Sequence, residues 1–270
     1  MDGREVTGAD VSVVQLIGPF RNIMAFFTSC QYARSSALEL EGNILAMEIL
    51  HLRFSRWGAA LKFSGEVANP KELHAAVRYR TDVAAAKQVL ARIASHFEDI
   101  AKITTGRKFE SVVSTATGSH SMTSEALIQR MRELAHSRQC KVKPLSKVHW
   151  YLMLARIRSK SFRRQWKRGT AKANWIFSKE DKSKITKLAK ELAGLMDSLE
   201  DYVSGDDTII RSCYDEEVSK ILLAAPPGSP QLSSLRNALL RRDNRLQEAI
   251  AHRERGTVAG NPRVDENGFF

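Results

Sequence analysis

Side chains able to do catalytic or metal chemistry are present in this sequence, but their spacing fits no known catalytic site. His136 and Cys140 lie four residues apart, which suits half of a metal site, and no second pair of ligands follows. The carboxylate pairs Asp206-Asp207 and Glu216-Glu217 are typical of loop and helix-surface charge. Nucleophile-elbow, zinc-protease, dinucleotide-binding and phosphate-binding-loop motifs are missing from the sequence. We therefore predict a protein that is not an enzyme and that needs no metal or cofactor.

The strongest chemical signal is a basic segment from Arg156 to Lys172, which holds eight Lys or Arg residues and no acid. Phe162 and Trp166 are interleaved with these charges. Three interpretations remain open: a solvated helix face, a surface for anionic lipid headgroups, or a nucleic-acid contact in which the aromatic rings stack on bases. The residues predicted to contact anionic headgroups are Arg163, Arg164, Lys167 and Arg168.

A second signal is the apolar stretch from Val11 to Phe27, which Gly18-Pro19 and Arg21-Asn22 interrupt. Because proline fits the first turn of a helix, the pattern predicts a helix from about Pro19 to Tyr32. Its apolar side chains either pack inward as core or, once the helix is released, enter a membrane while Arg21 reaches a headgroup. The predicted inserting residues are Val14, Leu16, Ile17, Phe20, Ile23, Met24, Phe26 and Phe27.

The composition favours an intracellular helical protein with an anionic partner. Hydrophobic residues make up 43% of the 270-residue chain, and the net charge of +12 suits either nucleic acid or the cytoplasmic membrane leaflet. The three scattered cysteines are typical of a reduced compartment. No secretory signal and no stretch of about 18–20 apolar residues occurs. We expect a cytoplasmic protein that is soluble at rest.

The apolar spacing predicts an all-α bundle of about six to eight helices. Loops are expected at 65–70 and 105–121, where Gly, Ser, Thr and Pro gather. The final residues, 253–270, lose the helical period and predict a flexible tail. Besides the helix near the N-terminus, helices are expected over about 37–57, 71–102, 123–137, 179–203, 214–223 and 232–252.

The run Arg53-Phe54-Ser55-Arg56-Trp57-Gly58 ends the long second helix. Trp57 is expected to be buried, while Gly58 serves either as a left-handed cap or as a point of close approach for another segment. Trp175, ahead of the Leu-rich helix, is expected to be a second buried anchor.

These features, taken in order along the chain, resemble the HeLo domain of the fungal heterokaryon-incompatibility, or prion-inhibition-and-propagation, family. The resemblance rests on an apolar N-terminal helix with Phe20, Phe26 and Cys30, on the Arg53–Gly58 run, and on the block from Lys172 to Val203. Phe54 stands where the family signature has Leu. The match covers about residues 8–223, and the part at about 151–169 looks like a basic insertion.

The resemblance implies a domain organisation. A HeLo-like helical domain would cover 1–230, with its N-terminal apolar segment at 8–34. A C-terminal helix would follow over 231–252, and the flexible tail over 253–270.

It also implies a programmed-cell-death effector that permeabilises the plasma membrane. In that family a C-terminal prion-forming tail adopts a β-solenoid when templated, which unfolds part of the helical domain and exposes the N-terminal helix. The implied partners are anionic membrane lipids, a second copy of the chain and an amyloid-templating protein. Two alternatives remain: an inhibitory or regulatory adaptor of the same family, and a basic nucleic-acid-binding protein.

The tail holds one short stretch that resembles part of an amyloid pseudo-repeat of that family. It ends in a Gly-Asn pair that a β-arc would use as a turn, and no second copy follows before Phe270. A flexible tail is therefore the favoured interpretation. The residues of the stretch are Arg255, Gly256, Thr257, Val258, Ala259, Gly260 and Asn261.

Overall fold

The computed structural model describes residues 9–32, 37–63, 82–104, 124–138, 175–177, 179–203 and 205–259. Within these ranges the chain forms eight α-helices, which confirms the predicted all-α bundle. The basic segment at 156–172, with its four predicted headgroup residues, lies outside the described residues. So do the two expected loops and residues 71–81. The helix expected over 71–102 does not run through Asp82, because the Asp82 side chain accepts the Ala85 backbone N–H and a helix begins at Val83.

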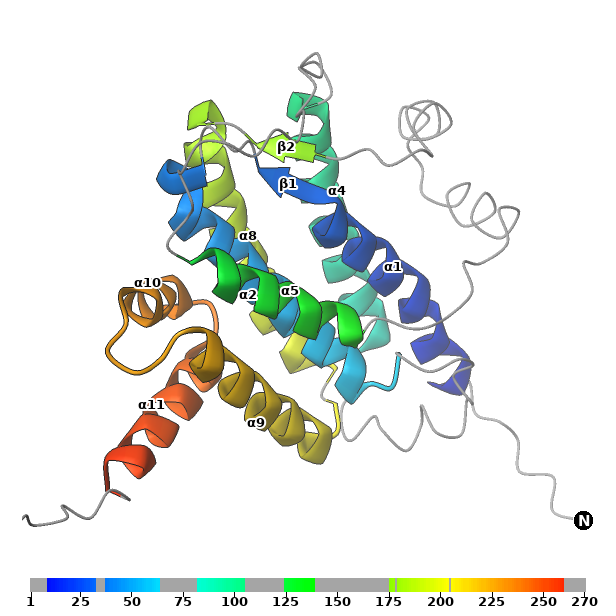
Figure 1. Ribbon diagram of the computed structural model, residues 1–270. Coiled ribbons are helices and arrows are strands. Elements are labelled where there is room, and N and C mark those ends of the chain that lie inside the picture. The colour runs from blue at the N-terminus through cyan, green and yellow to red at the C-terminus, as the bar shows by residue number, and fades with distance from the viewer. Residues whose placement is uncertain are drawn as a thin grey trace, which may run out of the picture.

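The helices enclose one core, and Figure 1 shows α1 and α4 on one side of α2 and α8, with α9, α10 and α11 on the other. Two three-residue strands, β1 (Cys30–Tyr32) and β2 (Trp175–Phe177), pair in parallel with Cys30 opposite Trp175. A 3-10 turn, η2 (Lys179–Asp181), leads into α8. The helices are α1 (Ala9–Ser29), α2 (Ala37–Ala60), α4 (Val83–Thr104), α5 (Glu125–Ser137), α8 (Lys182–Tyr202), α9 (Asp207–Ala224), α10 (Pro230–Leu239) and α11 (Asn244–Ala259).

Helix α2 is the centre of the bundle. Every residue from Ile44 to Gly58 is buried, because α1, α5, α8, α9 and α10 all pack against this helix. An amphipathic helix usually buries one stripe, whereas the structure covers α2 on all sides. A charge on such a helix must find a partner inside the protein. Four ionisable side chains of α2 are in this position: Glu48, His51, Arg53 and Arg56.

Helix α1 begins ten residues earlier than predicted, so the expected start at Pro19 is wrong. Pro19 lies inside the helix. A proline in a helix interior removes one hydrogen bond and costs about 3 kcal/mol or more. Here the apolar side chains on both sides of Pro19 are buried, and their packing offsets that cost.

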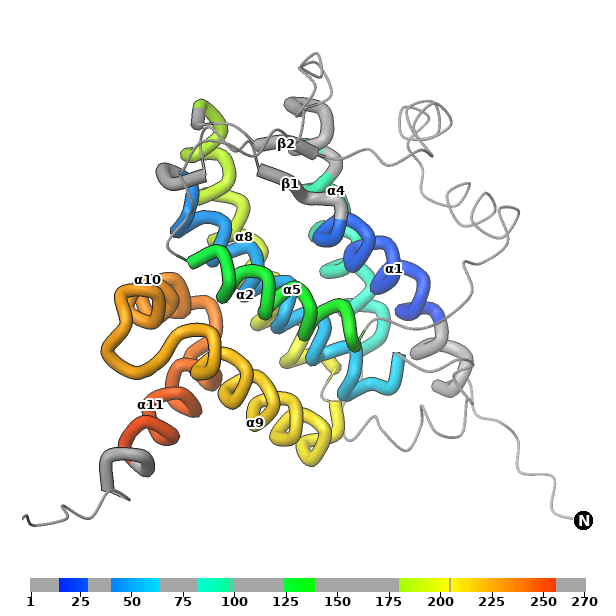
Figure 2. Tube along the Cα trace, in the orientation of Figure 1, coloured from blue at the N-terminus to red at the C-terminus, as the bar shows by residue number. Residues whose placement is uncertain are grey.

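The C-terminal third also departs from the prediction, as the chain trace in Figure 2 shows. Helix α9 starts at Asp207 rather than 214, because the Asp206 side chain caps it by accepting the Thr208 backbone N–H. The single helix expected over 232–252 is two helices, α10 and α11, that turn at Leu240–Asp243. Helix α11 continues to Ala259, so the predicted flexible tail does not begin at 253.

Candidate functional site

The predicted membrane-inserting surface is the buried face of α1, which packs on α4 and α2. Apart from Val14, whose side chain is outside the described set, all the predicted side chains are brought together in the core. The core interpretation therefore describes the form seen here, and insertion remains a prediction. The buried residues are Leu16, Ile17, Phe20, Ile23, Met24, Phe26 and Phe27.

Aromatic rings form the contact between α1 and α2. The Phe20 ring centroid lies 4.9 Å from that of Phe54 and 5.5 Å from that of Phe63. Further along α1, Phe27 stacks on the His51 ring at 5.1 Å and meets Phe97 of α4 edge-on at 4.9 Å. Such pairs contribute about 0.5–1.5 kcal/mol each beyond their buried area.

Gly58 makes the approach of Phe20 possible. A Cβ atom at this position would lie 2.1 Å from Cζ of Phe20, so no other residue fits without moving the ring. The close-approach interpretation is confirmed. The left-handed-cap interpretation is wrong, because Gly58 lies within α2 and the left-handed residue is Lys62, with φ of 55°.

The end of α2 is tied to the segment that joins α8 to α9. The buried Trp57 side chain donates from Nε1 to the Val203 carbonyl at 3.1 Å, which confirms Trp57 as a core anchor. The Asp206 backbone N–H donates to the Ala60 carbonyl at 3.2 Å. Trp175 lies in β2, and its side chain is outside the described set.

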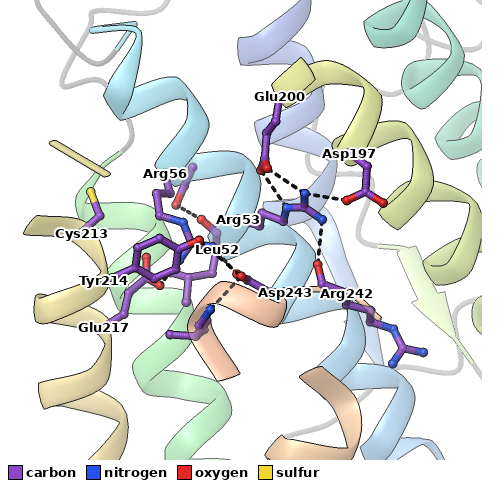
Figure 3. Close-up of polar contacts among 12 residues, drawn as sticks. Leu52, Arg53, Arg56, Asp197, Glu200, Cys213, Tyr214, Glu217, Arg242 and Asp243 are labelled. Carbon is purple, nitrogen blue, oxygen red and sulfur yellow. Dashed lines mark hydrogen bonds and ion pairs between the residues drawn. The ribbon is translucent and has the colours of Figure 1, made fainter. Parts of the chain in front are cut away.

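Arg53 joins α2 to α8 and to the α10–α11 turn (Figure 3). Its guanidinium donates to Glu200 at 2.7 Å, to Asp197 at 2.8 Å and to the Arg242 carbonyl at 2.8 Å. Burial opposes the charge, but Glu200 and Asp197 hold the pKa of the Arg53 guanidinium above its ordinary value. Arg53 is therefore a permanent cation that binds two other parts of the fold.

Arg56 joins α2 to α9 and α11. Its guanidinium forms ion pairs with Glu217 and Asp243, whose side chains are 0% and 3% exposed, and it lies 3.9 Å above the Tyr214 ring. Arg138, which follows α5, pairs with the other carboxylate oxygen of Glu217. We call Arg56, Arg138, Glu217 and Asp243 the buried charge cluster. Removing one member of such a cluster leaves an uncompensated buried charge.

Burial shifts the pKa values of two side chains here: Glu217, a member of the cluster, and Tyr214, which lies against Arg56. Burial raises the pKa of the Glu217 carboxyl, while Arg56 and Arg138 act against that rise. Burial likewise raises the pKa of the Tyr214 hydroxyl, against the opposing effect of Arg56. Tyr214 therefore stays neutral well above its ordinary pKa of 10.0.

The geometry suits holding helices together rather than binding a cofactor. In the part of the chain that the structure describes, no three His, Cys, Asp or Glu side chains could hold a metal ion. A hollow of about 270 Å³ beside Arg53 is lined by four arginines and four acids, so it presents no net charge to an ion. Cys140 lies outside the described residues, so the structure does not test whether His136 and Cys140 come together.

Sequence reasoning missed most of the charge cluster. The Glu216-Glu217 pair was predicted to be surface charge, which is wrong for Glu217. A signal was available, because Cys213, Glu217 and Ile221 recur every four residues and share the buried face of α9. Asp243 carried no such signal, since it lies in a turn and reaches Arg56 across 187 residues.

The architecture and the Arg53–Gly58 run together can now be compared with known proteins. The sequence model of the HeLo family, described as prion-inhibition and propagation, matches residues 8–225. The chain belongs to the HeLo family. No curated protein matches it.

Two solved structures share the HeLo fold with this chain. The HET-S N-terminal domain superposes with a TM-score of 0.61 at 19% identity, covering 89% of this chain and 94% of that domain. A double mutant of the HET-s N-terminal domain gives 0.60 at 21% identity, covering 88% and 98%. The Arg53–Gly58 run has two structural roles here. Phe54, Trp57 and Gly58 contact α1, while Arg53 and Arg56 bind the C-terminal part of the fold.

Proposed function

We propose that this HeLo protein is a fungal cell-death effector in heterokaryon incompatibility, whose resting form keeps a membrane-active helix inside the bundle. The observation that carries the proposal is the burial of seven large apolar side chains of α1. These side chains would form the inserting surface. Phe20 and Phe27 among them pack on Phe54 of α2, which stands between Arg53 and Arg56, and Phe26 packs on α4.

Release of α1 needs a trigger. Burying one large apolar side chain stabilises a protein by about 1.5–3 kcal/mol, so the seven contribute roughly 10–20 kcal/mol. The whole free energy of unfolding of a domain is about 5–15 kcal/mol. Helix α1 therefore cannot leave while its neighbours stay in place, and activation must loosen α2 or α4, the helices on which it packs.

The C-terminal helices offer a route for that loosening. The first five residues of the amyloid-like stretch, Arg255 to Ala259, are helical in α11. A β-arc formed there by a templating partner would have to unwind the end of α11. The same helix begins beside Asp243, which pairs with Arg56 of α2. Amyloid templating at the tail would in this way weaken the contact of α11 with α2, and through α2 the packing that holds α1.

The membrane side of the proposal rests on charge and on the family. Arg163, Arg164, Lys167 and Arg168 would contact anionic headgroups, and the protein would move from the cytoplasm to the plasma membrane on activation. A resting homodimer is part of the same proposal. None of the described helices is both long and apolar enough to span a bilayer.

An inhibitory adaptor of the HeLo family is the second candidate. Pro19 and Arg21 favour it, because both lie within α1. An arginine at the centre of a membrane helix costs about 2.5–3.5 kcal/mol in insertion experiments. Such a helix would be buried in the resting bundle and still fail to permeabilise a membrane.

Dye release from anionic liposomes separates these candidates. The full chain and a chain lacking residues 1–34 are compared before and after seeding with fibrils of a 245–270 peptide. Because removing α1 also uncovers the core, Arg21→Leu is tested beside it, and it should increase release if α1 enters the bilayer. Release only after seeding and only with α1 present supports the effector. Binding without release supports the adaptor, and salt-dependent binding to nucleic acid alone would favour a nucleic-acid protein.

A further inference from the structure

Helix α8 carries its charges in the order that a helix disfavours. Its first half bears Lys182, Lys184, Lys187 and Lys190 with a single acid, Glu191, and its second half bears only acids, Asp197, Glu200 and Asp201. The helix dipole favours acids near the N-terminus and bases near the C-terminus, by about 0.3–1 kcal/mol for each charge in the end turns. Glu180 and Asp181 stand just before the first turn and offset part of the lysine charge there, so the lysines farther along, Lys187 and Lys190, are the ones that the helix itself does not explain.

The acidic half is explained by the fold. Asp197 and Glu200 hold the buried Arg53 guanidinium at 2.8 and 2.7 Å. The contact with the buried Arg53 charge offsets the unfavourable position of these two carboxylates near the C-terminal end of the helix dipole.

The lysine half has no comparable partner. Lys184 lies 3.9 Å from Asp181, and Lys187 lies 3.8 Å from Glu191, which is too far for a hydrogen bond. The two lysine side chains are 52% and 78% exposed, so these pairs contribute little. Lys190 is exposed and forms no ion pair with another described residue.

Three of the lysines, Lys184, Lys187 and Lys190, recur every three residues along α8. Lys187 and Lys190 lie opposite its buried Ile185, Leu188 and Leu192, and Lys184 lies at the exposed edge of that buried face. We call these three residues the lysine stripe. Since a helix rises about 1.5 Å per residue, the stripe spans about 9 Å.

The lysine stripe lies at the end of the bundle where α1 finishes. Strand β2 leads into α8 through η2, and it pairs with β1, which directly follows α1 (Figure 1). In the sequence, the basic segment that ends at Lys172 precedes β2 by two residues. A surface that holds this end against an anionic layer would also bring the C-terminal end of α1 to it.

We propose that the lysine stripe is a docking surface for anionic phospholipid headgroups, an inference that rests on the proposed membrane function. Lysine is a compact, mobile charge without the planar fork that arginine offers to a fixed phosphate. The exposed residues between the lysines, Ser183 and Thr186, bring no aromatic ring for stacking on bases. The chemistry suits a diffuse layer of headgroups better than a nucleic-acid strand.

The test is binding of the full chain to vesicles of phosphatidylcholine alone and with added phosphatidylserine. The variant is the triple Lys184→Gln, Lys187→Gln, Lys190→Gln. A basic residue near an anionic surface is worth about 1 kcal/mol, or about fivefold in affinity. We expect the triple variant to bind phosphatidylserine vesicles about 10- to 100-fold more weakly.

A matched control removes the same charge elsewhere, at three exposed residues on α9, in the α10–α11 turn and at the start of α11: Arg211→Gln, Arg241→Gln, Arg245→Gln. It should lose several-fold less affinity than the lysine variant. Thermal melts of both variants check that the fold is intact. Equal losses in the two triples would overturn the proposal, as would absent binding of the unaltered chain to phosphatidylserine vesicles. Loss of duplex or single-stranded DNA binding without loss of vesicle binding would also overturn it.

Dye release, measured on the same samples, reports on the proposed function separately. If binding depends on the lysine stripe but no dye is released, the docking surface is supported and the membrane-damaging activity is rejected. If the lysine substitutions change neither binding nor dye release, the activity is supported and the docking surface is rejected.

Discussion

Arg56 of α2 and Asp243 at the start of α11 form a buried ion pair across 187 residues of sequence. Asp243 also accepts the Leu246 backbone N–H at 3.1 Å, so the same carboxylate caps α11. Arg56 in turn precedes Trp57 and Gly58, which pack against Phe20 of α1. One short segment of α2 therefore contacts both the first and the last helix of the fold.

The first prediction concerns the buried charge cluster. Arg56→Met should lower the free energy of unfolding by about 3–5 kcal/mol, because Glu217 and Asp243 lose the cation between them while staying buried. Urea denaturation measures the change. The control is Arg130→Met, which breaks an exposed pair with Glu133 at 3.0 Å and should cost less than about 1 kcal/mol. Similar losses in both variants would show that the cluster is not a structural link.

The parts of the fold that could be predicted from the sequence are those that depend on contacts within a single helix. The helices over 123–137 and 179–203 were predicted from apolar spacing alone, and α5 and α8 occupy Glu125–Ser137 and Lys182–Tyr202. Periodicity within one helix carries that information. The burial of the α1 residues was one of two interpretations, and the sequence could not choose between them.

What could not be predicted depends on contacts between distant segments. Pro19 argued against a helix through residues 9–29, and only the packing of α1 on α4 and α2 outweighs it. The partners of Arg53 lie on α8 and in the α10–α11 turn, more than 140 residues away. No local pattern specifies such partners.

The second prediction concerns the limits of the folded unit. The family match ends at residue 225, yet Leu232 and Leu235 of α10 are buried and α10 packs on α2. A chain shortened to 1–225 should therefore melt at a clearly lower temperature or fail to fold, since it also loses Asp243. A chain shortened to 1–259 keeps every described helix and is the control. Equal melting temperatures would show that α10 and α11 do not stabilise the bundle.

The third prediction concerns alkaline pH. Burial raises the folded-state pKa of Tyr214 above 10.0, so its contribution to stability is complete below that pH. As the pH rises further, the unfolded chain gains free energy by ionising Tyr214 and the folded chain does not, so stability falls by up to about 1.4 kcal/mol per pH unit. Tyr214→Phe should flatten this decline between pH 9 and about 11 in urea titrations. An equally steep decline in the Tyr214→Phe variant and in the unaltered chain would show that Tyr214 is not the group responsible.

The last prediction concerns the contact between Gly58 and Phe20. Gly58→Ala should lower the free energy of unfolding by about 1–3 kcal/mol, because the added methyl group would overlap the Phe20 ring. The control is Gly194→Ala on the exposed face of α8, where a Cβ meets nothing within 4 Å. Alanine is the better helix former, so this control should stabilise the protein by about 1 kcal/mol.

A double variant shows whether the Gly58 effect passes through α1. Phe20→Leu removes the ring that the new methyl group would strike, so it should recover part of the loss caused by Gly58→Ala. Urea denaturation of the two single variants and the double variant gives the coupling free energy. Strict additivity would mean that Gly58 acts on α2 alone and that the close approach of Phe20 does not hold α1 in place. A coupling of about 1 kcal/mol would identify this contact as one that release of α1 must break.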